Sequence, residues 1–484
     1  MLQRQVQADR PAETATRRIR DLPGPRGLPF LGNALQLDAS RLHLIAEEWS
    51  RKYGEMYQLS IAGRRFLVLT NPETIATVLR DRPDGFQRTT RLNRVAREMG
   101  FGGVFSSNGE QWRRQRPMVM AAFDPAHIKS YFPALVKVTE RFARRWLRAA
   151  GAARVIDLQA DLMRYTVDVT AGLAFGTDIN TLESEDEVIQ SHLNKVLPAV
   201  FKRLVAPFDY RHWFKLPAER ELQPHLAAIR HAVDDFIAQA RSRMEREPAR
   251  RAQPTNLIEA MIAARDAEGS GLDDTDVAGN VLTMLLAGED TTANTLAWMI
   301  YLLSRNPPAL ERARNEVHTV LGTERVPRRY EDLTALAYVE ACAHETMRLR
   351  PVAPLLMNEA VRDSVVAGVE VRKGEFVMCL MRPGATDARH FPQPQAFDPG
   401  RWLADPAGVK AASSAKRVSM PFGAGPRLCP GRYLALHEMK MVLAMLLAGF
   451  EIQSVDTTDG REPREHLALS MSPVGLRMRL KARP

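Results

Sequence analysis

Apolar residues recur at three- and four-residue spacing over four long segments of the chain, residues 135–149, 156–175, 222–244 and 276–303. That spacing gathers apolar side chains on one face of an α-helix and therefore predicts four long helices. The last segment carries the longest pattern. Because no internal repeat or low-complexity tract interrupts these patterns, we expect a predominantly helical globular chain.

Strand-like patterns are fewer and shorter. Ile61 and Phe66–Leu69 predict a short hairpin, and a helix is expected to follow with Asn71 as its cap and Pro72 at its first position. Strand-like residues return over 365–379 and 468–480. The predicted fold class is therefore mostly α with a small β portion (α+β).

Composition is typical of a large globular protein, with 484 residues, 45% hydrophobic and 26% charged. No window reaches the roughly 18 uninterrupted apolar residues that a membrane-spanning helix needs. Three widely spaced cysteines argue against a disulfide framework and for a reducing compartment, so a cytoplasmic location is expected. The formal net charge of +10 favours an acidic partner, and without an aromatic-basic module nucleic acid is not expected.

The first 21 residues carry five arginines and lack an apolar core. We expect a disordered basic tail over 1–21. A mitochondrial transit peptide is a second interpretation, which Asp9 and Glu13 disfavour. The following run, Pro23–Pro29, is rich in proline and glycine and predicts an irregular entry segment.

One cysteine lies in a glycine-rich loop, Phe422–Gly431, with Arg427 two residues before Cys429. A nearby cation, backbone amides and a helix N-terminus all favour a thiolate, which is a strong metal ligand. Pro430 has no N–H, so an amide that points at the sulfur must come from Gly431 or beyond. An isolated cysteine in a turn is more often an inert packing residue, but the residues around Cys429 favour a metal ligand.

A second unusual segment, Ala287–Thr292, lies in the middle of the longest helical pattern. Gly288 costs on the order of 1 kcal/mol in a helix interior, and two acids and two threonines interrupt an apolar run. Thr291 could donate a hydrogen bond back to the carbonyl of Ala287 and open a groove in the helix. Alone, such a hexapeptide is more often an exposed acidic turn.

The cysteine loop resembles the haem-binding signature of the cytochromes P-450, the haem-thiolate monooxygenases. An aromatic residue, glycines, a basic residue, the cysteine and a glycine follow in the family's order. The resemblance implies a single large domain over 22–484, shaped like a triangular prism, and haem b as cofactor. It makes Cys429 the axial ligand of the iron, and it assigns cofactor contacts to Trp112, Arg116, Phe422, Gly425, Arg427 and Gly431.

The same resemblance gives roles to two further groups. Asp290 and Thr291 would be the catalytic pair that delivers protons to dioxygen. Glu345 and Arg348, three residues apart on a predicted helix, would form a structural triad with Arg401. Pro117 disfavours helical geometry at Arg116, which makes the implied contact between Arg116 and a haem propionate the least secure of the cofactor contacts. After Pro354, many family members carry an arginine that this chain lacks.

The activity that the resemblance implies is insertion of one oxygen atom from O2 into a C–H bond, by hydroxylation or epoxidation. The substrate would be a lipophilic small molecule such as a fatty acid, terpenoid, steroid or polyketide. The segment at Ala435–Glu438 is most similar to bacterial fatty-acid hydroxylases of the family. The expected substrate pocket comprises mainly apolar residues, namely Leu286, Ala287, Ala353, Leu355 and Met471.

Electrons are expected from a separate ferredoxin or flavodoxin with an NAD(P)H reductase, and the enzyme is expected to be a monomer. The donor would dock on the cysteine side, at basic residues drawn from Arg113, Arg114, Lys416, Arg417 and Lys440. Two alternatives stay open: a peroxide-using or rearranging haem-thiolate enzyme, and a non-catalytic haem-thiolate sensor. The Asp290–Thr291 pair favours the monooxygenase, because only that activity needs proton delivery to dioxygen.

Overall fold

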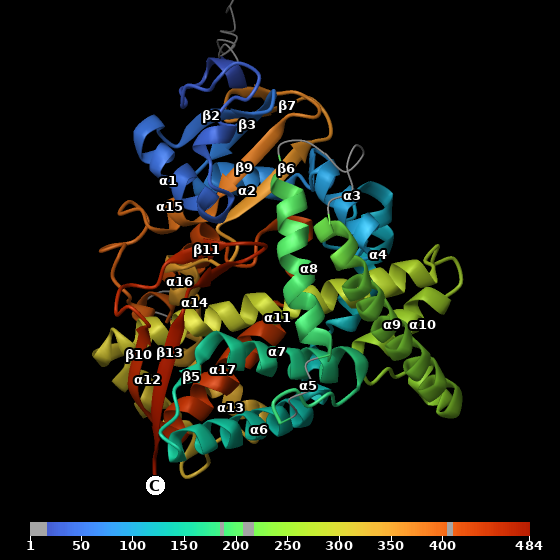
Figure 1. The fold of residues 1–484 in the computed structure, drawn as a ribbon, viewed down its shortest axis with the longest axis vertical. Coiled ribbons are helices and arrows are strands. Elements are labelled where there is room, and N and C mark those ends of the chain that lie inside the picture. The colour runs from blue at the N-terminus through green and yellow to red at the C-terminus, as the bar shows by residue number, and fades with distance from the viewer. Residues whose placement is uncertain (1–16, 184–187, 207–216, 404–409) are drawn as a thin grey trace, which may run out of the picture.

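The structure is a computed structural model that describes residues 17–183, 188–206, 217–403 and 410–484. It tapers from a broad helical base to a small β-rich lobe (Figure 1). The helices are α1 Leu42–Tyr53, α2 Pro72–Arg80, α3 Thr90–Met99, α4 Gly109–Ala122, α5 Pro125–Ser130, α6 Phe132–Gly151, α7 Leu158–Phe175, α8 Val188–Val205, α9 Pro217–Arg246, α10 Leu257–Asp266, α11 Asp274–Ser304, α12 Pro307–Leu321, α13 Tyr330–Ala335, α14 Ala337–Leu349, α15 Met381–Ala385, α16 Lys410–Ser419 and α17 Arg432–Gly449.

The strands form four small sheets in the described part of the chain. They are β1 Arg17–Arg18, β2 Met56–Ile61, β3 Arg64–Leu69, β4 Phe86–Gln87, β5 Ile156–Asp157, β6 Leu355–Ala360, β7 Ser364–Val366, β8 Val369–Val371, β9 Phe376–Leu380, β10 Phe450–Thr457, β11 Glu465–Leu467, β12 Met471–Pro473 and β13 Leu476–Ala482. The prediction of a mostly α chain with a small β portion is confirmed.

The largest sheet has the order β2-β3-β9-β6-β4. Its predicted hairpin is present, and the two-residue turn between β2 and β3 has positive φ at both Ala62 and Gly63, the geometry that matches the twist of paired strands. Strand β9 then joins β3 in parallel, with Phe66 opposite Phe376. Asn71 caps α2 as predicted, accepting hydrogen bonds from the amides of Glu73 and Thr74.

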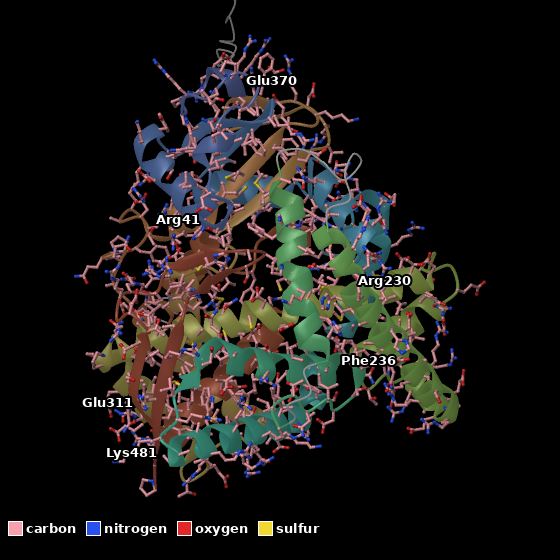
Figure 2. All side chains as sticks on the ribbon, viewed as in Figure 1. Arg41, Arg230, Phe236, Glu311, Glu370 and Lys481 are labelled. Atoms are coloured by element: carbon pink, nitrogen blue, oxygen red, sulfur yellow. The ribbon has the colours of Figure 1, made fainter. Side chains whose placement is uncertain are left out.

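The helical base is built around α11, which crosses the centre of Figure 1 beside α7 and α17. Residues 279–285 and 292–301 of this helix are buried, and Trp298 is fully enclosed. Figure 2 shows the charged side chains of Glu311 and Lys481 at the edge of the molecule, away from this centre. The core therefore surrounds the helix that carries the acid–threonine segment.

Two predicted boundaries change. Residues 1–16 of the predicted tail lie outside the described residues, but Arg17–Arg18 pair with β8 and Ile19 is buried, so the end of that tail is ordered. The predicted helix over 156–175 begins only at Leu158. Asp157 is its cap, and Ile156 and Asp157 pair with β13 instead.

Candidate active site

The cysteine loop is a tight turn that leads into α17. The amide of Cys429 donates to the carbonyl of Phe422 over 3.0 Å, which closes the loop. Cys342 and Cys379 are buried, whereas Cys429 is partly accessible. Phe422 is half-buried and packs against the main core. Among the three cysteines of the chain, Cys429 alone presents a sulfur that a cofactor could reach.

Burial raises the pKa of the Cys429 thiol, while the amide of Gly431 and the cations Arg116 and Arg432 lower it. The amide predicted from Gly431 is thus present, but burial outweighs the three favourable groups. A metal cation bound to the sulfur supplies the missing positive charge, because a coordinated thiol loses its proton. The donor set fits a metal bound at this sulfur.

Gly425 fixes where the loop lies. It has φ +70°, and a Cβ built there would lie 2.5 Å from the carbonyl oxygen of Leu79 in α2. The side chain of Arg82 holds the same contact by donating to the carbonyl of Ala424 over 2.9 Å. Gly425 is therefore needed for close packing of the loop on α2. Gly431 has only ordinary contact with Phe123 and contributes through its amide.

Four arginines gather beside the loop: Arg82, Arg88, Arg116 and Arg427. Burial, with the charges of Arg88 and Arg82 next, lowers the pKa of Arg427 to about 9. Burial also lowers the pKa of Arg88 to about 10. None of the four pairs with a carboxylate in the described ranges, and the Nε atoms of Arg88 and Arg427 are buried without partners. Clustered buried cations require an anion, and a cofactor with two propionates fits that requirement.

The predicted cofactor residues divide into two sets. Arg427 lies 4.7 Å from the ring centroid of Trp112 and donates to the carbonyl of Ser107 over 2.7 Å. Arg116 instead donates to the carbonyl of Leu428 over 2.5 Å and lies beside the sulfur. Sequence reasoning missed Arg82 and Arg88. The only signal was their basic character in a weakly patterned segment.

Helix α4 continues through Pro117, contrary to the expected loss of helical geometry there. Trp112, Met118 and Val119 are all buried on this helix. Their burial offsets the hydrogen bond that proline cannot donate. Arg116 thus remains in helical geometry and faces the cysteine loop.

The middle of α11 has accessible surface, although residues 279–285 before it and 292–301 after it are buried. Ala287 is exposed and Leu286, Gly288 and Thr291 are half-buried. Thr291 donates to the carbonyl of Ala287 over 2.8 Å, so the predicted back-bond is present. A Cβ at Gly288 would lie 2.7 Å from Oγ1 of Thr170, which explains the glycine by close packing on α7.

Asp290 points toward the β11–β12 hairpin. Its Oδ1 accepts from Asn294 over 2.7 Å, and its Oδ2 accepts from the hydroxyl of Ser470. Burial raises the pKa of Asp290, whereas these two bonds lower it. The neighbouring Glu289 is 1% exposed, and burial together with the charge of Asp290 raises its pKa to about 8.

Glu345, Arg348 and Arg401 meet as the resemblance implied. Arg348 makes two bonds of 2.7 Å to the Glu345 carboxylate, and both side chains are fully buried. Arg401 reaches the same carboxylate over 3.3 Å. The indole of Trp402 and the amide of Asp398 also donate to it. The cluster ties α14 to the segment before the cysteine loop.

The expected pocket residues are not equivalent. Leu286, Ala287, Ala353 and Leu355 all retain accessible surface. Met471 is fully buried, with 0% exposure, and contributes no accessible surface to this wall. The reason is that its amide is bonded to the carbonyl of Val352 and its side chain faces the core.

Lys440 does not belong to a docking surface either. It is 5% exposed, and its Nζ pairs with Glu340 and donates to the carbonyl of Leu333 over 2.8 Å. Lys416 and Arg417 are exposed, as are Arg113 and Arg114 on α4. The remaining basic residues of the predicted docking face are thus at the surface.

The chain matches the family model "Cytochrome P450" over residues 22–479. It is 28% identical to cyclooctatin synthase of Streptomyces melanosporofaciens, covering 96% of each chain, and 27% identical to pentalenene oxygenase of Streptomyces avermitilis, covering 95% of this chain and 97% of the relative. It is also 29% identical to a self-sufficient cytochrome P450 monooxygenase of Exserohilum turcicum, with 96% of this chain but 43% of that protein covered.

The chain therefore belongs to the cytochrome P450 family and is a monooxygenase. Its cofactor is haem with an axial cysteine thiolate, and its reaction needs O2 and an electron donor. No helix among the described segments combines the length and apolar character that crossing a membrane would need.

Proposed function

We propose that this enzyme oxidises a C–H bond of a lipophilic, terpenoid-type substrate with Cys429 as the axial ligand of its haem. The observation that carries the proposal is the partly accessible Cys429 beside four arginines that lack carboxylate partners in the described part of the chain. Two of these arginines, Arg82 and Arg427, are buried. When bound, haem supplies the activation of O2 that inserts one oxygen atom into the substrate.

The residues of this chain would act around that cofactor. Arg427 and Arg88 would neutralise the propionates, and Trp112 would hold the Arg427 guanidinium in place by its ring face. Glu345 and its partners would keep the cysteine loop in register with α14. The closed loop would hold the sulfur in a fixed position.

Proton delivery would fall to the accessible turn of α11. The Thr291 hydroxyl can rotate away from the Ala287 carbonyl and donate its hydrogen bond to dioxygen in the site. Asp290 would then resupply the proton that the Thr291 hydroxyl gives up. A sensor does not need this pair. An enzyme that uses peroxide takes its oxygen already reduced and does not need it either, so the pair favours use of O2.

The substrate class rests on the wall of the site and on the relatives. Leu286, Ala287, Ala353 and Leu355 offer apolar surface without charge. Relatives matched over nearly their whole length include pentalenene oxygenase and cyclooctatin synthase, and both names refer to terpenoid compounds. A fatty acid, the alternative from the sequence, would need a partner for its carboxylate.

Electrons would come from a separate ferredoxin or flavodoxin with its reductase, received at the exposed basic residues Arg113, Arg114, Lys416 and Arg417. We further propose that residues 22–484 form one domain and act as a monomer in the cytoplasm. The family match over 22–479 supports the single domain. Size-exclusion chromatography and cell fractionation test the other two statements.

The test is a carbon monoxide difference spectrum of the reduced protein. We expect the thiolate-type Soret band in the wild type and in Cys342→Ala, and its loss in Cys429→Ser. An unchanged band in Cys429→Ser would refute the assignment. A panel of terpenes and fatty acids, scored by the ferric spin-state shift, then tests the substrate class; a shift with fatty acids alone contradicts it.

A further inference from the structure

Both carboxylate oxygens of Asp290 accept hydrogen bonds from uncharged side chains. Oδ1 accepts from the amide of Asn294, one helical turn further along α11, and Oδ2 accepts from the hydroxyl of Ser470. Asn294 and Ser470 are 1% and 4% exposed. No arginine, lysine or histidine pairs with Asp290 within the described ranges. The acid is therefore held without a counter-charge.

The hydrogen bonds around Asp290 form a chain in which the donors lead toward its carboxylate. The amide nitrogen of Asn294 also donates to Ser470 Oγ over 3.1 Å, which leaves the Ser470 proton for Asp290. The amide of Gln159 donates to Asn294 Oδ1 over 3.0 Å and so fixes which end of the Asn294 amide faces the acid. Gln159 lies half-buried in the first turn of α7, beside the exposed Ala160. The chain thus runs from near the surface to the acid.

Ser470 is itself held firmly. The hairpin of β11 and β12 places it in a turn closed by the bond from the Ala468 amide to the Ser470 carbonyl, 2.9 Å long. Before the turn, Glu465 accepts from Arg382 over 2.6 Å and contacts His43 over 2.8 Å. A turn anchored on both sides leaves the Ser470 hydroxyl little freedom.

We propose that Ser470, Asn294 and Gln159 are positioning residues that aim the Asp290 carboxyl and set the pH at which it ionises. The proposal rests on the proposed role of Asp290 in proton delivery. Hydrogen bonds from neutral donors stabilise the ionised form less than a salt bridge does, so a buried acid held in this way takes up a proton at a higher pH than an exposed carboxyl does. The titratable neighbour on its own helix is Glu289, whose pKa responds to the Asp290 charge. On β11 the charged residue is Glu465, already paired with Arg382 and Arg350.

The test compares Ser470→Ala and Asn294→Ala with Ser472→Ala, which removes a hydroxyl from the same hairpin without touching the acid. Loss of a donor destabilises the ionised carboxyl. The infrared band of its protonated form, assigned by its absence in Asp290→Asn, should therefore persist to a pH roughly one unit higher. The pH midpoint of product formed per electron consumed should move the same way. Ser470→Thr should restore both.

Gln159→Leu should shift the pH midpoint less, because Gln159 acts on Asp290 only through Asn294. Since Gln159 is partly exposed, this variant should fold even if the substitutions at the buried Ser470 and Asn294 do not. Midpoints unchanged in Ser470→Ala, Asn294→Ala and Gln159→Leu, or an equal shift in Ser472→Ala, would overturn the proposal. Normal coupling in Asp290→Asn would instead overturn the proton-delivery role. An infrared shift that follows these substitutions would then still support the positioning chain.

Discussion

Arg427 lies over the indole of Trp112, with its guanidinium carbon 4.7 Å from the ring centroid. The two residues come from the cysteine loop and from α4, 315 positions apart in the sequence. A planar cation on an aromatic face keeps a fixed orientation even where burial makes its charge costly. The pair therefore presents a preoriented cation for an anionic cofactor.

Replacing Arg427 by leucine should weaken haem retention. The variant loses a charge-assisted contact but keeps the side-chain volume near Trp112, so we expect haem transfer to apomyoglobin to be on the order of tenfold faster. Arg427→Lys should be intermediate. Arg113→Ala, which removes an exposed ion pair on the same helix as Trp112, serves as control and should behave as wild type.

Gly425→Ala should be far more damaging than Gly423→Ala. Both glycines have positive φ, +70° and +77°, so each alanine carries similar backbone strain of about 1 kcal/mol. Only at position 425 would the new Cβ meet the backbone of α2, at Leu79. We expect Gly425→Ala to yield little haem-bound protein and Gly423→Ala to yield nearly normal amounts, measured by pigment per purified protein. Equal yields would show that the approach to α2 is not the constraint.

Thr291→Ala should separate electron use from product formation. The variant lacks the hydroxyl that now donates to the Ala287 carbonyl, so proton delivery to the oxygen being reduced would be less well directed. More of the reduced oxygen would then leave the site as peroxide. We expect product per electron to fall by about fivefold and Thr291→Ser to recover most of it. Thr295→Ala removes an equivalent back-bond on the same helix, to Thr291, and should leave coupling intact.

Glu345→Ala should be among the most destabilising substitutions in the protein. It would leave the fully buried Arg348 guanidinium without its carboxylate and would also release Arg401 and Trp402. Breaking a buried pair in this way costs about 3–5 kcal/mol, so loss of folded haem protein is expected, measured by denaturant unfolding. Arg389→Ala, at an exposed ion pair with Asp387, should leave stability nearly unchanged.

Glu289 should make the protein less stable as pH rises. Its folded-state pKa of about 8 lies above the ordinary value of 4.5, so between these values the folded state keeps a proton that the unfolded state has released. Stability should fall across that interval and level off above pH 8. Glu289→Gln should remove this slope and gain about 2–5 kcal/mol at pH 8.5, with no gain at pH 4. Parallel stability curves for the two proteins would contradict the buried, protonated acid.

The sequence predicted the long helices well because their apolar residues recur at helical spacing: α6 buries one such stripe, and most of α11 is apolar and enclosed by the core. It also located Cys429 and Thr291, because their chemistry shows in adjacent residues. Arg82 and Arg88 could not be found in this way: their importance comes from lying next to Arg427, which only the tertiary fold creates.

The errors have a common origin in local reasoning. Lys440 was expected at the surface as a cation, but Glu340 and the Leu333 carbonyl, supplied by other helices, satisfy it in the interior. Pro117 was expected to disturb α4, but core contacts on both sides maintain the helix.

Because the cysteine loop packs on α2 at Gly425, the haem colour of the protein indicates whether the chain has folded completely. In the folded protein the loop that carries Cys429, near the end of the chain, packs on α2, a segment near its start. A polypeptide that stalls before this long-range encounter would stay unpigmented however much haem the cell provides. Haem absorbance in a crude lysate would thus measure the amount of fully folded protein. Colonies of a variant library could be ranked for folding by their colour.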